Sequence, residues 1–230
     1  MPGPAIRDRG PGKFLSRGYQ GAVYLHGSGA QLRVVKQPMG GGLALRLRKA
    51  MLRREFTAYQ RLAGILGVPR CFGLQDDGSL VLEYVAGEAY RESVPALRDR
   101  DRFFRELLSQ ILAVHAAGVA HADLKRRGNI LVSPEGHPQL LDFGSAVRRK
   151  AGGGWWNRFL FRQACRMDLN AWVKLKYRGR YASITPEDAP YYQPTAIEGA
   201  ARVIRRVWRK VTGRRWRKAW RQRRQRGFRG

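Results

Sequence analysis

The sequence has few cysteines, few acidic residues and no long hydrophobic segment, and each shortage excludes a class of protein. The two cysteines, Cys71 and Cys165, stand outside any C-x-x-C pair, so neither a disulfide framework nor a zinc site is expected. No apolar run approaches the roughly 18 residues of a membrane-spanning helix, and the first residues lack the apolar core of a signal peptide. We therefore expect a protein of a reducing compartment, either cytoplasmic or bound to a membrane surface.

Acidic residues are strongly outnumbered: 17 Asp and Glu stand against 45 Lys and Arg, a formal net charge of +28. Fourteen of the basic residues follow Glu198, where no acid occurs, so the tail carries +14 and the remainder 31 − 17 = +14. Such a surplus predicts a polyanionic partner, which could be nucleotide phosphates, nucleic acid, an anionic membrane or a phosphorylated glycolipid. A chain of 230 residues with 43% apolar content fits one domain of two lobes better than two independent domains.

The stretch from His121 to Gly144 carries the clearest signs of chemistry. H-A-D-L-K-R-R-G-N-I-L-V begins at His121, and D-F-G begins at Asp142. An Asp and an Asn on one tight loop, with a second Asp after a short apolar strand, suit phosphoryl transfer from a magnesium nucleotide. Asp123 would accept the proton of the attacking hydroxyl, whereas Asn129 and Asp142 would hold Mg²⁺, which prefers oxygen ligands. A plain β-hairpin with acidic turns is the alternative; the apolar pairs on either side of a P-E-G turn disfavour it, because they gather the polar residues at one end.

Through its H-x-D-L…N-I-L-V loop and its D-F-G, the sequence resembles the protein-kinase-like superfamily. The resemblance implies an α+β, two-lobed protein-kinase-like fold with a small β-rich N-lobe and a reduced helical C-lobe, and ATP and Mg²⁺ as cofactors. We expect an irregular basic arm over residues 1–13, the N-lobe over 14–87, the C-lobe over 88–198 and a basic tail over 199–230.

A glycine-bearing segment near the start matches the kinase phosphate-binding loop in part. The pattern G-x-G-x-x-G-x-V is met at Gly18, Gly21 and Val23, with Ser16 in place of the first glycine. Glycines at these positions let backbone amides approach phosphates. Because glycine-bearing hairpins are common, this match gains weight only from the motifs that follow it.

Lys36 and Glu55 supply that weight. Lys36 ends a predicted strand, and Glu55 follows nineteen residues later on a predicted helix. The resemblance implies that Lys36 contacts the α and β phosphates and that Glu55 holds it by an ion pair. Either residue alone would be an ordinary solvated charge, but together they stand in register with the later motifs. The helix is predicted from an apolar stripe: Leu45, Leu52, Phe56, Tyr59 and Leu62.

Residues 80–87, L-V-L-E-Y-V-A-G, are predicted to form a buried strand that runs into a glycine. The segment resembles the hinge between the lobes of kinases. The resemblance implies that main-chain groups near Glu83 and Val85 bind the adenine edge, with Leu82 at the back of the pocket. A plain core strand is compatible with the same residues.

Two helical regions are predicted in the second half of the chain, one over 101–117 and one or two helices over 157–177. The resemblance suggests that Asp168 anchors the backbone of the catalytic loop, while an N-cap is the other open interpretation. His121 is expected to bond the loop backbone near the D-F-G turn, and His115 to pack in the core. The apolar face of the first helix comprises Phe103, Phe104, Leu107, Leu108, Ile111, Leu112 and His115.

Three departures separate the chain from regulated protein kinases. Ala122 replaces the arginine of H-R-D, five residues rather than four separate Asp123 from Asn129, and the C-lobe is short. This compact pattern looks like the atypical bacterial kinases, above all the lipopolysaccharide kinase family, which phosphorylates Kdo or heptose of the lipid A core. RIO-type protein kinases share the H-x-D-L loop and are the runner-up; aminoglycoside-type phosphotransferases usually carry a longer C-lobe.

Two basic segments bear on the partner. Residues 201–230 combine tryptophans and aliphatic residues with arginines, which predicts an interfacial helix on anionic lipid, and nucleic-acid binding is the less favoured alternative. The five cations within residues 46–54 form either a solvated face or a site that recruits a phosphorylated or lipidic substrate.

The predicted activity is ATP-dependent phosphoryl transfer to a hydroxyl of a membrane-associated sugar or glycolipid, such as the lipopolysaccharide core. The alternative is an atypical RIO-like serine/threonine protein kinase or ribosome-associated ATPase with a protein acceptor. A basic scaffold without catalysis is disfavoured by the intact set of Lys36, Glu55, Asp123 and Asp142. We expect a cytoplasmic protein, peripheral on the inner face of the inner membrane.

Overall fold

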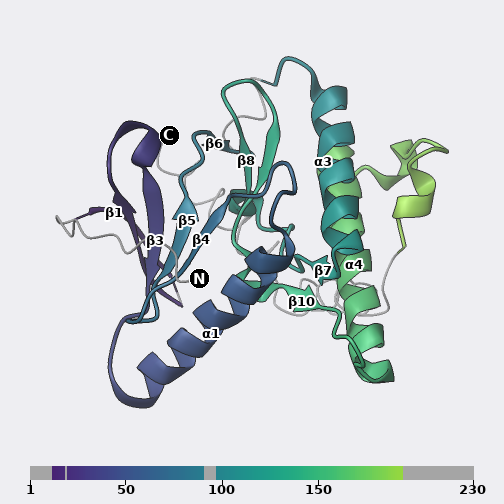
Figure 1. The fold of residues 1–230 in the computed structure, drawn as a ribbon. Helices are drawn as coiled ribbons and strands as arrows, with labels where there is room; N and C mark the ends of the chain where they lie inside the picture. Colours follow the sequence, from purple (N-terminus) through teal and green to yellow (C-terminus); the bar gives the residue numbers. More distant parts are fainter. Residues whose placement is uncertain (1–11, 19, 91–96, 194–230) are drawn as a thin grey trace, which may run out of the picture. The chain divides into compact units, whose positions relative to one another are not determined.

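The computed structural model describes residues 12–18, 20–90 and 97–193 (Figure 1). The chain divides into two compact units, Met1–Tyr192 and Gln193–Gly230, and the description below concerns the first. The predicted interfacial helix of the tail and nearly all of the basic arm lie outside the described residues. No helix in the described part is long and apolar enough to cross a membrane.

An antiparallel five-stranded sheet forms the first half, in the order β1-β2-β3-β5-β4. Strand β5 ends at Glu83, four residues before the glycine to which the sequence extends it. Residues 84–87 have no regular secondary structure, and Tyr84, Val85 and Gly87 among them line a cavity. The strands are β1 (Lys13–Gly18), β2 (Gly21–His26), β3 (Arg33–Gln37), β4 (Cys71–Leu74) and β5 (Leu80–Glu83).

One long helix, α1 (Gly42–Arg61), follows the sheet's third strand and packs against β4 and β5 (Figure 1). It begins directly after two glycines and is capped at its end by Leu62. The predicted apolar stripe is confirmed, because Leu52, Tyr59 and Leu62 are buried. The same stripe places Glu55 inward, which brings a carboxylate into contact with the sheet.

The second half is built on two helices, α3 (Arg100–Ala116) and α4 (Trp155–Lys176), which lie side by side (Figure 1). Residues 157–177 therefore belong to one helix rather than two. Short strands connect these helices to the predicted catalytic loop: β6 (Glu88–Ala89), β7 (Val119–Ala120), β8 (Ile130–Val132), β9 (Pro138–Leu140) and β10 (Val147–Arg148). The 3₁₀ turns are η1 (Gly29–Gln31), η3 (Arg127–Asn129), η4 (Phe143–Ser145), η5 (Tyr181–Ser183) and η6 (Ala189–Tyr191).

Helix α3 buries most of its predicted apolar face, but not all of it. Phe103, Phe104, Leu107 and Ile111 are at most 2% exposed, whereas Leu112 is 41% exposed. Leu112 was wrongly predicted to be core, because a step of one residue turns the helix by about 100° and carries its side chain past the edge of the buried face.

Aromatic side chains join the two helices. Tyr90 stacks on Phe103, and Trp172 of α4 meets the ring of Phe104 edge to face. The indole Nε1 of Trp172 donates a hydrogen bond of 2.9 Å to the carbonyl of Phe104, so this buried polar group is satisfied. The predicted α+β class is confirmed, and the rigid helical pair supports the loops that carry the polar residues.

Candidate active site

A cavity of about 750 Å³ collects the predicted site residues. It is bounded by the β1–β2 hairpin, the segment after β5, the loop before β8 and the residues around the D-F-G turn. Of the predicted residues, all except Glu55 line it directly: Gly18, Gly21, Val23, Lys36, Glu83, Val85, Asp123, Asn129 and Asp142. Residues more than one hundred positions apart thus meet in one space.

The ammonium group of Lys36 is held between two carboxylates. Its Nζ donates to Glu55 Oε1 at 2.6 Å and to Asp142 Oδ1 at 2.9 Å. Burial alone would lower the pKa of Lys36, but the charges of Glu55 and Asp142 outweigh it and raise that pKa above its ordinary value. Lys36 is therefore a fixed cation that faces the cavity.

Asp142 stands at a backbone position that few residues adopt. Its φ is 64° and its ψ 74°, in the left-handed region, directly before turn η4. Burial tends to raise the pKa of Asp142, yet Lys36 and the Gly144 amide bring it below the ordinary value. Backbone strain of this kind persists where the surrounding structure enforces it, often at functional sites. The result is an ionised carboxylate aimed at the cavity.

Asn129 and Asp123 are joined despite the extra residue between them. Asn129 Nδ2 donates to the carbonyl of Asp123 at 3.1 Å and lies 3.4 Å from its Oδ2. Two successive turns absorb the additional length, since the amide of Arg126 bonds Asp123 and that of Asn129 bonds Arg126. Because Nδ2 faces Asp123, the amide oxygen of Asn129 is the atom suited to a metal.

Asp168 anchors the catalytic loop, and the alternative of an N-cap is wrong. It lies inside α4, 1% exposed, where its two oxygens accept the backbone amides of His121 and Ala122 at 2.7 and 2.8 Å. His115 Nε2 is 3.1 Å from the same carboxylate. His121 in turn reaches the carbonyl of Leu141 at 2.8 Å, as predicted. Since Ala122 has a left-handed φ of 63°, these bonds fix a strained turn directly before Asp123.

The β1–β2 hairpin covers one side of the cavity. Gly21 has a φ of 147°, and a Cβ there would come within 2.0 Å of the carbonyl oxygen of Gln37, so only glycine fits. Gly18 meets no such obstacle. Gln20, between them, lies against Gly144 of the D-F-G turn, which joins the hairpin to the acidic end of the cavity.

The other end of the cavity is apolar. Val23, Val34 and Leu82 line it from the sheet. Val85 lines it from the segment after β5, and Leu131 from β8. Leu131 is the middle residue of a strand whose neighbours are buried, so it alone of the three faces the space. The flat base of a nucleotide would fit between these surfaces, with the phosphates of the nucleotide toward Lys36.

Comparison with known proteins shows to which family the chain belongs. Residues 20–160, more than half of the chain, match the family model described as the protein kinase domain. The chain belongs to the protein kinase family. This supports the predicted two-lobed kinase fold at the level of the superfamily, while the narrower resemblance to lipopolysaccharide kinases stays a hypothesis.

Several curated protein kinases are similar to parts of the kinase domain. A probable serine/threonine-protein kinase, pknA2, of Bifidobacterium longum is 40% identical over 29% of this chain and 9% of its own length. The CBL-interacting serine/threonine-protein kinase 13 of Arabidopsis thaliana is 29% identical over 59% of this chain and 28% of its own. A putative cyclin-dependent kinase F-2 of Oryza sativa is 37% identical over 32% and 24%. The chain thus spans less than a third of each of these relatives.

The family implies a magnesium nucleotide, and the kinase domain's residues fit one. Asp142 contributes an ionised carboxylate and Asn129 an amide oxygen, both of the hard oxygen type that Mg²⁺ prefers. Among the described residues no group of three or more His, Cys, Asp or Glu could form an all-protein metal cage.

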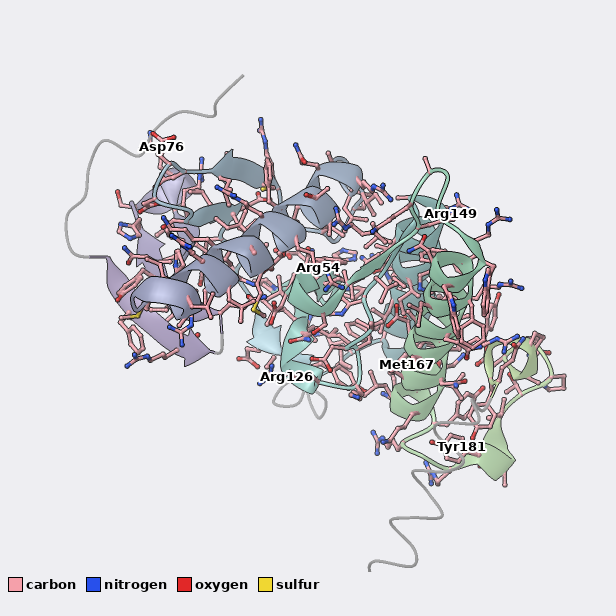
Figure 2. The ribbon with its side chains drawn as sticks, turned by 90° about the horizontal axis from the view of Figure 1, so that it is seen from below. Arg54, Asp76, Arg126, Arg149, Met167 and Tyr181 are labelled. Atoms are coloured by element: carbon pink, nitrogen blue, oxygen red, sulfur yellow. The ribbon has the colours of Figure 1, made fainter. Side chains whose placement is uncertain are left out.

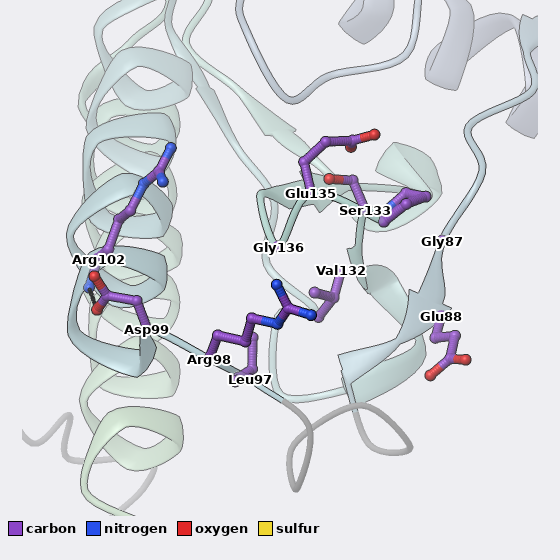
Figure 3. Close-up of a pocket in the computed structure, with 11 residues that line it drawn as sticks. Gly87, Glu88, Leu97, Arg98, Asp99, Arg102, Val132, Ser133, Glu135 and Gly136 are labelled. Atoms are coloured by element: carbon purple, nitrogen blue, oxygen red, sulfur yellow. Dashed lines mark hydrogen bonds between the residues drawn. The ribbon is translucent and has the colours of Figure 1, made fainter.

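A second cavity of about 750 Å³ shares Gly87 with the first but has a different character (Figure 3). Arg98 projects into it, and Asp99 beside it accepts the amide of Arg102 at 2.8 Å as the N-cap of α3. Its acidic and basic side chains are mixed, and none of the predicted site residues lines it. It adds no group to the site of the kinase domain.

Gln20, Arg126 and Leu131 line the cavity but are not among the residues that the sequence predicts for the site. Residues 130–132 are all apolar, so no alternation in the sequence singles out Leu131, and only the folded loops show the positions of Gln20 and Arg126.

Proposed function

We propose that the protein is an ATP-dependent phosphotransferase that acts on a hydroxyl group. The observation that carries this proposal is the bridge of Lys36 to Glu55 and Asp142, in a cavity that also holds the linked pair Asp123 and Asn129.

Each side chain has one task in this proposal. Asp123 orients the acceptor hydroxyl and takes its proton as the new bond forms. Lys36 neutralises phosphate charge, and Glu55 keeps it extended across the cavity. Bound Mg²⁺ supplies charge neutralisation at the transferring phosphoryl group. Asn129 and Asp142 would hold the Mg²⁺ ion. Catalysis therefore comes mainly from the placement of the reacting groups and from electrostatic stabilisation.

For the acceptor, a serine or threonine hydroxyl of a protein is the candidate that the relatives support. The similar proteins carry serine/threonine-protein kinase or cyclin-dependent kinase in their names. Because the aligned segments cover less than a third of each of those proteins, the acceptor is carried over as a proposal. It replaces the glycolipid as the first candidate.

A hydroxyl of a membrane-associated sugar or glycolipid is the second candidate. It is favoured by the exposed cations of α1, Arg46, Arg53 and Arg54, and by the basic tail. A phosphorylated glycolipid would be attracted by both. This candidate entails a cytoplasmic location at the inner face of the inner membrane. Nucleic-acid retention by the tail is the remaining, less favoured role.

The substitution Asp123→Asn tests the reaction. It keeps the shape of the side chain but removes the proton acceptor, so turnover should fall about 10²- to 10⁴-fold. Affinity for the magnesium nucleotide should stay within about twofold, because Asp123 is not assigned to the metal. Lys36→Met, by contrast, should lose nucleotide binding, and turnover should fall with it. Undiminished turnover in Asp123→Asn would refute the proposal.

The acceptor is tested by incubating the full chain with ATP labelled at the γ-phosphate. One reaction contains a dephosphorylated protein mixture, the other a deacylated lipopolysaccharide precursor. We expect the label in protein, on serine or threonine. Alkali should release this label more readily than it releases phosphate from phosphotyrosine. Label confined to the sugar would make the second candidate the correct one, and Asp123→Asn serves as the blank in both reactions.

A further inference from the structure

The amino-terminal end of α4 carries exposed hydrophobic side chains that the kinase site does not use. Trp155, Trp156, Phe159 and Leu160, together the aromatic patch, are 65%, 58%, 42% and 54% exposed. The two indoles stack with ring centres 3.9 Å apart, and Phe159 meets Trp156 edge to face. Clustered exposed aromatics of this kind mark interaction surfaces.

The aromatic patch lies on the side of α4 that faces away from the core. Trp155 and Phe159 are four residues apart, as are Trp156 and Leu160, so the patch covers one face of the first two turns. Phe161, Ala164 and Asp168 occupy the opposite, buried face. Packing of the described kinase domain therefore gives no reason for the patch, which needs a partner outside it.

Positive charge surrounds the patch without compensation along the chain. Between Asp142 and Asp168 there is no acidic residue, whereas six basic residues occur: Arg148, Arg149, Lys150, Arg158, Arg162 and Arg166. Three of them recur every fourth residue along α4 and are exposed, which aligns them as a stripe beside the patch. An apolar face bordered by arginines is the pattern of a helix that lies in a membrane interface.

Next to the patch is a cavity of about 500 Å³ with a basic lining, here the basic cavity. Arg61, Arg149, Lys150 and Arg158 contribute to it, together with the glycines of the turn before α4, and no acid does. Arg61, at the end of α1, donates to the carbonyl of Arg149 at 2.6 Å, so the cations are held together. Figure 2 shows Arg149 beside the start of α4, with Met167 farther along the helix.

The charges of this region repel one another. Partial burial and the nearby guanidinium groups of Arg61 and Arg54 lower the pKa of Arg148. Arg54 is fixed there by a hydrogen bond of 3.0 Å to the carbonyl of Ala146. Cations kept close in the folded protein without an acidic partner favour an anion as the natural ligand.

We propose that the aromatic patch and the basic cavity bind the surface of a bilayer that contains anionic phospholipids. The indoles would sit at the boundary of head groups and acyl chains, where tryptophan is enriched in membrane proteins. The basic cavity and the arginine stripe would meet the phosphates of the head groups. A soluble anion would leave the aromatics without a role, and a purely apolar partner would leave the cations without one.

The decisive measurement is sedimentation of the full chain with lipid vesicles. The variant Trp155→Ser with Trp156→Ser is compared with Leu43→Ser with Leu66→Ser, which changes residues that are 82% and 86% exposed elsewhere. On phosphatidylcholine vesicles with phosphatidylglycerol, the tryptophan variant should bind roughly tenfold more weakly than the unchanged chain. The leucine variant should stay within about twofold. Equal binding of both variants would overturn the proposal, and would assign any membrane affinity to the tail.

A second pair of variants tests the charges. Lys150→Glu with Arg158→Glu should weaken binding to phosphatidylglycerol vesicles and leave the weak binding to pure phosphatidylcholine unchanged. The matched control is Arg105→Glu with Lys174→Glu, which reverses the same number of charges at exposed positions on α3 and α4. If inorganic phosphate binds the basic cavity but the charge variant binds vesicles normally, the site takes free anions and the proposal fails. It also fails if the tryptophan variant converts a dimer to a monomer in sedimentation equilibrium while vesicle binding persists.

Discussion

At the scale of single residues, one buried carboxylate determines the position of the catalytic loop. Asp168 accepts two consecutive backbone amides directly before Asp123, and a third contact comes from His115. These bonds cross from α4 to the loop, so they transmit the rigidity of a long helix to the proton acceptor. They also compensate the left-handed turn at Ala122, which a non-glycine residue adopts at a cost of roughly 1–3 kcal/mol.

Asp168→Asn should therefore destabilise the protein by about 2 kcal/mol, because an amide nitrogen would face one of the two backbone donors and leave it unsatisfied. Turnover should fall as well, while nucleotide affinity changes little. Urea unfolding followed by circular dichroism measures the first effect. Asp76→Asn, at an exposed turn, is the control and should stay within about 0.5 kcal/mol. An Asp168→Asn protein as stable as this control would show that the anchor is dispensable.

The contact of Asp142 with Lys36 predicts how the free energy of unfolding changes at acidic pH. Because the folded pKa of Asp142 is below its ordinary value of about 3.9, the unfolded chain binds its proton first as pH falls. The stabilisation is present above that ordinary value and is lost as pH drops through the folded value. The free energy of unfolding should thus decrease less steeply between pH 5 and pH 3 in Asp142→Asn than in the unchanged chain. Parallel curves would contradict an ionised, paired Asp142.

Residue chemistry was predictable wherever a motif fixes both type and spacing. Lys36, Glu55, Asp123, Asn129 and Asp142 were selected from sequence, and the structure brings them together. Side chains whose position depends on the fold of a neighbouring loop, such as Gln20 against Gly144, carry no comparable signal in the sequence.

At the scale of elements, two glycines of one motif in the β1–β2 hairpin have different structural surroundings. Gly21 sits where a Cβ would collide with the backbone of Gln37, and Gly18 sits in open space. The first is required by close approach of two strands, and the second only by whatever ligand lies beneath it.

Gly21→Ala should consequently destabilise the protein by about 2 kcal/mol, since both the positive φ and the collision oppose it. Gly18→Ala should change the free energy of unfolding by less than about 0.5 kcal/mol, while it reduces affinity for the magnesium nucleotide. Thermal melting and nucleotide titration of the two variants separate these effects. Similar melting of both would mean that the hairpin relaxes around Gly21.

Element boundaries were less predictable than element types. The periodicity of residues 101–117 identifies α3, but it cannot show that Leu112 lies beyond the reach of α4. Likewise, the apolar run from Leu80 continues past Glu83 in sequence, while the strand ends there because Glu83 pairs with Arg33, the first residue of the antiparallel β3. In both cases the limit is set by a neighbouring element that is distant in sequence.

At the scale of the whole molecule, charge and catalysis are distributed differently. The nucleotide site lies within Met1–Tyr192, where Lys36 pairs with two carboxylates, while the segment after Glu198 holds +14 and no acid. Composition predicts an anionic partner but not its identity, because lipid, nucleic acid and phosphorylated sugars all present phosphates. The acceptor therefore has to be measured rather than read from the motifs.

Truncation after residue 200 separates the contributions of the tail and of the aromatic patch to membrane binding. If each basic residue near an anionic surface contributes about 1 kcal/mol, the truncated chain should bind phosphatidylglycerol vesicles much more weakly and with a smaller dependence on salt. The remaining binding should depend on Trp155 and Trp156, and turnover with a soluble acceptor should be unchanged. Vesicle sedimentation over a series of salt concentrations measures this. Unaltered salt dependence after truncation would remove the tail from membrane attachment, and RNA that copurifies only with the full chain would assign it to nucleic acid instead.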